Sequence, residues 1–142
     1  MGTGKNKNPL GGFYLQEWNE ETEKIGGVKV LTNDSNKRQN DLPVCSGDSR
    51  VYFKRNSEGE IIQLRVYDDN RNAMLDIDIN PDKAHRNRDG TIIGAGVTHA
   101  HDWKLNSNGD LIRSKNARLL TSSEILKYGV LLELSNPNVR YQ

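Results

Sequence analysis

Alternating hydrophobic and polar positions are clearest in the middle of the chain. Three runs rich in β-branched and aromatic residues, at 50–55, 61–67 and 73–79, are separated by the turn-forming segments NSEGE and DDNRN. Short turns join neighbouring antiparallel strands, so the pattern predicts a three-stranded meander. The alternation places Val51, Phe53, Ile62, Leu64, Val66, Leu75, Ile77 and Ile79 on a core face, and Tyr52, Lys54, Gln63, Arg65, Tyr67, Asp76 and Asp78 on the other.

The polar face of this meander has two interpretations. It is either an ordinary solvent-exposed surface or a platform for a ligand, since aromatic residues stand among its charged ones. Upstream, residues 13–24 (FYLQEWNEETEK) have helix formers and aromatic residues near helical spacing, and predict a short amphipathic helix. Residues 28–31 predict a brief strand, and residues 32–41 a polar loop.

Downstream of the meander, residues 80–90 predict a charged loop and residues 91–103 a further strand. Asn108-Gly109 is typical of a hairpin turn. Thr121 or Ser122 can cap a helix over SSEILKYG that stops at Gly129. The run VLLEL at 130–134 then predicts a last strand.

These elements predict a single α+β domain, with an antiparallel sheet of four to six strands and a short helix near each end. A chain of 142 residues is long enough for one such domain. Residues 1–12 (MGTGKNKNPLGG) are small, polar and rich in glycine, which predicts a flexible linker or the cut end of a longer protein. The domain itself is expected to span residues 13–142.

Charge and composition narrow the functional classes only slightly. Twenty basic and nineteen acidic residues give a net charge of +1, so any attraction to nucleic acid has to come from a local patch. No apolar run approaches the roughly 20 residues that a membrane-spanning helix needs. Cys45 is the single cysteine, which excludes an internal disulfide.

Candidate chemistry is concentrated between positions 85 and 101, which contain all three histidines of the chain. If His99 and His101 lie in an extended strand, period 2 puts both imidazoles on one face. Histidine titrates near neutral pH, so one ring can accept a proton while another donates one. RNA cleavage through its own 2′-hydroxyl requires such a pair and no metal, so we expect His99 and His101 as base and acid, with His85 as a third candidate.

Charged neighbours supply the other roles of this mechanism. A cation has to stabilise the negative charge that develops at phosphorus. Lys83, Arg86 and Arg65 are the candidates for that role, and Asp76 or Asp78 is expected to orient an imidazole.

Two alternatives remain open at this point. In the first, His99, His101, Asp78 and Asp102 hold a divalent metal such as zinc or manganese, because imidazole and carboxylate suit these ions, and the domain is a metal-dependent nuclease. In the second, the histidines are packing and hydrogen-bonding residues of a non-catalytic binding module in a phage particle or secreted complex.

The order of residues from 60 to 129 resembles a small C-terminal module of MuF-type phage minor head proteins and bacterial polymorphic toxins. The resemblance rests on RVYDDNRNAMLDIDIN, a following loop histidine, THAHDW and LLTSSEILKYG. Thr98 stands where the module has proline, and the histidine loop is longer and more basic. The residues matched to the motif are Asp76, Asp78, His85, His99, His101 and Trp103.

The resemblance implies a nuclease toxin carried at the end of a larger protein. Such a domain is delivered by secretion or by a phage, acts on RNA in the cytoplasm of a target bacterium, and has no membrane partner. A cognate immunity protein would mask its site, and an acidic one would complement the basic loop from Lys83 to Arg88.

Overall fold

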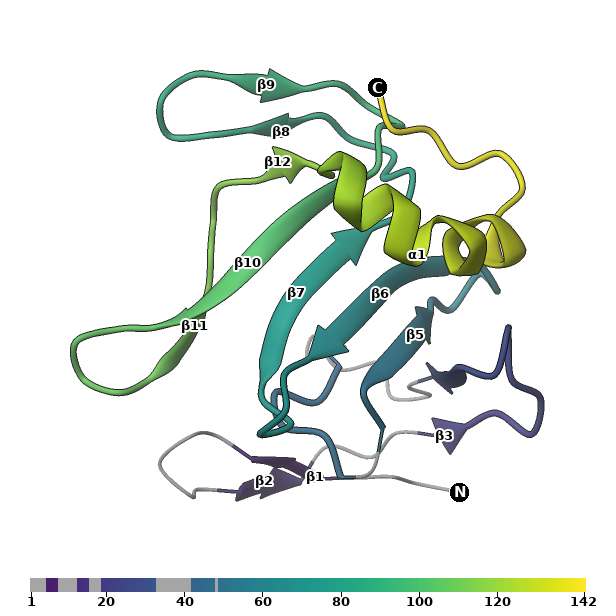
Figure 1. Cartoon of the computed structure of the whole chain (residues 1–142), viewed down its shortest axis with the longest axis vertical. Helices are drawn as coiled ribbons and strands as arrows, with labels where there is room; N and C mark the ends of the chain where they lie inside the picture. The colour runs from purple at the N-terminus through teal and green to yellow at the C-terminus, as the bar shows by residue number, and fades with distance from the viewer. Residues whose placement is uncertain (1–4, 8–12, 16–18, 33–41, 48) are drawn as a thin grey trace.

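The structure is a computed structural model that describes residues 5–7, 13–15, 19–32, 42–47 and 49–142 (Figure 1). A central sheet contains β3 (Asn19–Glu20), β4 (Lys29–Thr32), β5 (Val51–Arg55), β6 (Ile61–Tyr67), β7 (Ala73–Asp78), β10 (His99–Leu105), β11 (Leu111–Arg113) and β12 (Arg118–Leu119). Its order is β11-β10-β7-β6-β5-β4-β3, and β12 also pairs with β10. Two small sheets pair β1 (Lys5–Lys7) with β2 (Phe13–Leu15), and β8 (His85–Arg86) with β9 (Ile92–Ile93). The helix α1 (Ser122–Ser135) lies across the central sheet.

The α+β class and the antiparallel meander β5-β6-β7 are confirmed. The sheet differs from the predicted antiparallel sheet of four to six strands, because β4 and β5 run parallel and more strands take part. Parallel neighbours need a long connection, which residues 33–50 supply. The strand predicted at residues 28–31 is β4, whereas the polar loop predicted after it falls mostly on residues outside the described ones.

The helix predicted over residues 13–24 is not formed. Phe13–Leu15 pair with Lys5–Lys7, and Asn19–Glu20 pair with β4, so strand pairing overrides a weak helical pattern there. Part of this segment, residues 16–18, lies outside the described residues. Within the predicted linker, Lys5–Lys7 form β1, and the domain boundary after residue 12 stays a prediction.

The C-terminal helix starts where the sequence predicts but continues further. Thr121 is its N-cap: the Thr121 hydroxyl accepts from the Glu124 N–H at 3.1 Å, and the Glu124 carboxylate accepts from the Thr121 N–H at 2.9 Å. The helix passes through Gly129 and includes the run predicted as a last strand. Tyr128 and Leu132 pack into the core on either side of Gly129, so tertiary burial outweighs the low helix propensity of glycine.

Replacing Gly129 by alanine is expected to raise the free energy of unfolding by about 0.5–1 kcal/mol, the usual difference between the two residues inside a helix. A Cβ at this position meets Tyr141 Oη at 3.5 Å and Ile125 Cγ2 at 3.7 Å, which are ordinary contacts. Urea unfolding of the two proteins measures the change. A destabilised variant would instead indicate that Gly129 ends the helix, as its sequence context suggests.

The middle of the central sheet, around β6 and β7, is buried on both faces. Between the sheet and α1, the main core contains residues such as Phe53, Leu64 and Ile77. The register shifts after Lys54, and Ile61 rather than the predicted Ile62 belongs to this core. Behind the sheet lies a second cluster: Leu31, Leu42, Tyr52, Tyr67 and Ala73.

Residues 42–47 contribute to covering the polar face of the meander. The Tyr67 hydroxyl donates to the Pro43 carbonyl at 2.5 Å, and Arg65 Nη1 donates to the Leu42 carbonyl at 2.5 Å. The predicted polar face is therefore in large part interior. Among the residues that the structure describes, no helix is both long and apolar enough to cross a lipid bilayer.

Candidate metal centre

Strand register aligns the predicted site residues in two rows across β6, β7 and β10. Directly paired residues of neighbouring strands project from the same face of a sheet, so each row brings three side chains together. Both rows lie on the face away from α1, because the alternate residues Leu64, Ile77 and Ala100 belong to the core beneath the helix. The rows are Gln63–Asp78–His99 and Arg65–Asp76–His101.

The third histidine reaches these rows from the β8–β9 hairpin. The ring centroid of His85 lies 5.3 Å from that of His99 and 5.0 Å from that of His101. The centroids of His99 and His101 are 5.1 Å apart. One ring nitrogen from each residue lies within 4.8 Å of the others. His99 and His101 are 3% and 2% exposed, whereas His85 is half-buried. The histidines therefore form one cluster that opens to solvent on the His85 side.

In each of the three histidines, a backbone carbonyl contacts one of the two ring nitrogens. A carbonyl only accepts hydrogen bonds, so each contacted nitrogen carries the hydrogen, and the second nitrogen of a neutral ring keeps a lone pair. The nitrogens that these carbonyls leave free are Nδ1 of His85 and Nε2 of His99 and His101. The three bonds run from His85 Nε2 to Lys115 O (2.9 Å), from His101 Nδ1 to Ser114 O (2.8 Å) and from His99 Nδ1 to Val97 O (3.3 Å).

A carboxylate completes the cluster. Asp78 Oδ2 lies 3.4 Å from His99 Nε2 and 3.5 Å from His101 Nε2. Gln63 Nε2 donates to Asp78 Oδ1 at 2.9 Å, and Arg113 Nη2 donates to Oδ2 at 3.1 Å. Burial alone raises the pKa of Asp78, but the contacts with His99, Arg113 and Gln63 outweigh it and hold the pKa well below its usual range. Asp78 is therefore ionised at neutral pH.

The neighbouring carboxylate, Asp76, has a different role. Arg65 binds it through two bonds, Nε to Oδ1 at 2.6 Å and Nη2 to Oδ2 at 2.9 Å, and Arg113 Nε donates to Oδ2 at 2.6 Å. The side chains of Arg65 and Asp76 are 2% and 0% exposed. Arg65, predicted as a charge stabiliser, is thus held in a buried ion pair, and Asp76 faces arginines rather than an imidazole.

Other predicted site residues lie outside the cluster. Asp102, predicted as a metal ligand, is bound by Arg118 at 2.8 and 2.9 Å on the side of the sheet that carries α1, because neighbouring strand residues point to opposite faces. Lys83 precedes β8 and Arg86 lies within it, and both side chains are exposed. Trp103 is half-buried, and the guanidinium of Arg65 stacks over its ring at 4.8 Å.

Arg113 was missed in the sequence, although a signal for it exists. The turn at Asn108-Gly109 is confirmed, and its register pairs Trp103 with Arg113. Paired residues share a face, and Trp103 shares a face with His101, so the hairpin alone would have placed Arg113 beside the histidines. Gln63 binds Asp78, and the Ser114 and Lys115 carbonyls bind His101 and His85. These contacts depend on the tertiary structure and have no local sequence pattern.

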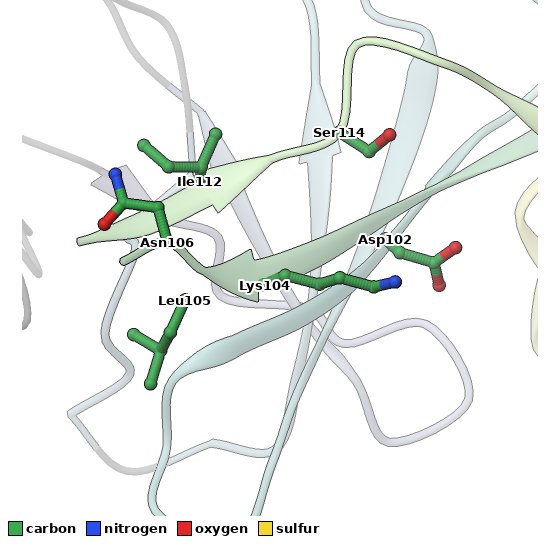
Figure 2. A pocket seen from close by; sticks show the side chains of 6 residues that line it. All are labelled: Asp102, Lys104, Leu105, Asn106, Ile112 and Ser114. Carbon is green, nitrogen blue, oxygen red and sulfur yellow. The ribbon is translucent and has the colours of Figure 1, made fainter. Parts of the chain in front are cut away.

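A groove of about 500 Å³ lies beside the β10–β11 hairpin but contains none of the histidines (Figure 2). It reaches the cluster only indirectly, since the Ser114 carbonyl accepts from His101. The groove is lined by Asp102, Lys104, Leu105, Asn106, Ile112 and Ser114.

The metal-free protein is expected to lose stability as the pH falls below about 6.5. Burial, and then the charge of Arg113, lower the pKa of His101 below that ordinary value, so just below pH 6.5 the unfolded chain binds a proton that the folded chain does not. Asp78, whose pKa is also lowered, extends the loss below about pH 3.9, its unfolded value. Urea midpoints across this range measure the effect. A flat profile between about pH 7 and pH 5 would contradict it.

No family model, no curated protein and no solved structure matches this chain. The resemblance to MuF-type and polymorphic toxin modules therefore stays a prediction from motif order. The chemistry of the site is argued from its own residues: three histidines that cluster around a common point and that can bind a metal ion.

Proposed function

We propose that the domain is a metal-dependent nuclease in which His85, His99 and His101 bind one divalent transition-metal ion. The main support is geometric: one ring nitrogen from each histidine lies within 4.8 Å of the others, and Asp78 Oδ2 lies 3.4 Å from His99 Nε2 and 3.5 Å from His101 Nε2. A cation would be bound by the three ring nitrogens, with Asp78 Oδ2 beside it. Three imidazoles favour zinc, and a site with three protein nitrogens keeps a position for water, as catalytic zinc sites do.

The distances require a modest contraction on binding. Zinc–nitrogen bonds of about 2.0–2.1 Å place tetrahedral ligands roughly 3.4 Å apart. Ring nitrogens within 4.8 Å of one another therefore need to approach by at most about 1.4 Å. Such a shift is within the reach of side-chain rotation, and His85 lies on a hairpin outside the central sheet.

The metal-free mechanism predicted from the sequence has less support. It requires His99 and His101 to reach oxygens on opposite sides of one phosphorus, each within about 2.6–3.2 Å. Both rings are nearly fully buried, and both direct Nε2 toward the same carboxylate oxygen. That arrangement suits a single ion better than a phosphoryl group.

A metal ion held by His85, His99 and His101 would supply a hydroxide nucleophile at neutral pH, because it would lower the pKa of a bound water to about 7. Ionised Asp78, which lies beside two of the rings, would accept a hydrogen bond from that water and orient it toward phosphorus. Arg113, whose side chain is 34% exposed, reaches the same carboxylate and can stabilise negative charge on the phosphoryl oxygens.

Exposed cations around His85 support a polyanionic substrate such as RNA. Lys83, Arg86, Arg88 and Lys115 are exposed, and in the described part of the chain none of them forms an ion pair. Asp82 and Asp89 are exposed in the same loop, so the four cations exceed the neighbouring carboxylates by two, whereas the whole chain carries a net charge of only +1. The same surface fits an acidic immunity protein, and delivery into the cytoplasm of a target bacterium by a larger carrier belongs to this proposal.

The test uses labelled RNA and DNA with protein stripped of metal and then reloaded with one equivalent of zinc or manganese. Cleavage is expected only with metal, and EDTA is expected to stop it. Full activity in EDTA, with 2′,3′-cyclic phosphate products, would establish the metal-free mechanism instead. Absence of cleavage, together with no growth defect on expression in bacteria, would favour the non-catalytic binding module.

A further inference from the structure

The β8–β9 hairpin that carries His85 pairs with no strand of the central sheet. A side chain in its turn, Asn87, instead attaches it to the segment that follows β11. Asn87 Nδ2 donates to the Ala117 carbonyl at 2.8 Å, and the Ala117 N–H donates to Asn87 Oδ1 at 2.8 Å. Asn87 Nδ2 also donates to the Thr91 hydroxyl at 3.1 Å, across the hairpin. The amide therefore replaces the backbone pairing that the hairpin lacks.

Residues 114–117, here called the bridging segment, contact two of the three histidines. The Ser114 carbonyl accepts from His101, and the Lys115 carbonyl accepts from His85. Its other two residues hold the hairpin: Asn116 Oδ1 accepts from the Arg88 N–H at 3.0 Å, and Ala117 pairs with Asn87 as described. The bridging segment thus holds the β8–β9 hairpin in place. It also orients the rings of His85 and His101, which lie in two separate sheets.

We propose that Asn87 is a positioning residue for the metal centre. By locking the hairpin onto the bridging segment, it holds His85 against the Lys115 carbonyl, with its free nitrogen directed at the other two rings. This inference rests on the proposed function, since it assumes that the three histidines bind a metal. Ala117 is 6% exposed, so removing the Asn87 amide leaves the N–H and the carbonyl of Ala117 without their Asn87 partner in a buried place. The hairpin is then expected to be held less firmly, by the Arg88–Asn116 and His85–Lys115 bonds alone.

The experiment compares Asn87→Ala with Asn106→Ala. Asn106 is a matched control, because its Oδ1 accepts from the Asn108 and Asp110 N–H groups at 2.9 Å and so holds another hairpin turn rather than the bridging segment. Zinc affinity, measured by competition with a chelator, is expected to fall about 10–100-fold in Asn87→Ala, as when the outer partner of a ligand is removed, and to stay unchanged in Asn106→Ala. Equal zinc affinity in both variants and the wild type would overturn the proposal.

A second readout separates this proposal from the proposed function. If the wild type binds no zinc, the metal centre fails, and the role of Asn87 is then decided by the imidazole NMR signals of the metal-free protein. In Asn87→Ala, we expect His85 to lose its Nε2–H tautomer while the signals of His101 are retained. An unchanged His85 signal would overturn the positioning role. Should the alanine variant not fold, Asn87→Asp retains the acceptor for the Ala117 N–H and is measured in the same way.

Discussion

Replacing His101 by alanine is expected to lower zinc affinity more than 100-fold and to abolish metal-dependent cleavage. Binding of zinc by four ligands releases about 10–16 kcal/mol, so one ligand contributes roughly 3 kcal/mol, and every 1.4 kcal/mol is tenfold. His101 is 2% exposed and fixed by the Ser114 carbonyl, so its loss removes one of the three ring nitrogens from a closely packed cluster. Competition titration with a chelator measures the affinity, and His99→Ala is expected to behave alike.

The control for this prediction is Asp102→Asn. Asp102 follows His101 directly, but it binds Arg118 on the opposite side of the sheet. Its replacement is expected to leave zinc affinity unchanged, even if the loss of the Arg118 ion pair lowers stability. Zinc binding that survives in His101→Ala but is lost in Asp102→Asn would contradict the assignment of the ligands.

Replacing Asp76 by alanine is expected to destabilise the protein by about 3–5 kcal/mol, because it removes the carboxylate that binds a buried arginine through two hydrogen bonds. Arg65 is held behind the sheet with 2% of its side chain exposed and cannot swing out to water. Arg113, the other partner of Asp76, is 34% exposed and still has Asp78. A loss of this size is a large fraction of the 5–15 kcal/mol typical of a whole domain. Urea unfolding measures it.

Two further variants make this prediction specific. Asp69→Asn removes an exposed ion pair with Arg50 and is expected to change stability little. The double variant Arg65→Met with Asp76→Leu is expected to recover much of the loss, since apolar side chains replace buried ion pairs at little cost. If Asp76→Ala and Asp69→Asn were equally stable, Arg65 would not be confined as the structure indicates.

The part of the fold that alternation controls could be predicted from the sequence. The meander β5-β6-β7 follows from period 2 and from turn residues, and the Asn108-Gly109 hairpin follows from the same local chemistry. For this reason, the sequence could predict that His99 and His101 lie on one face of the sheet. His85 joins them only through a hairpin that no sequence period describes.

Long-range contacts account for the errors. Strand pairing of Phe13–Leu15 overrode a weak helical pattern, and burial of Tyr128 and Leu132 carried α1 past Gly129. The parallel pairing of β4 with β5 depends on a long connection without a local pattern. Carbonyl groups that orient the imidazoles have no sequence signal, because every residue has a carbonyl.

X-ray absorption at the zinc edge, on protein loaded with one equivalent and dialysed at neutral pH, examines the metal centre itself. Three imidazole rings from one chain are expected around each zinc, with nitrogens at about 2.0–2.1 Å, and a light-atom ligand in a fourth position. Zinc that is lost on dialysis, or a zinc shell with no more than one imidazole, would show that the three histidines do not form a metal centre.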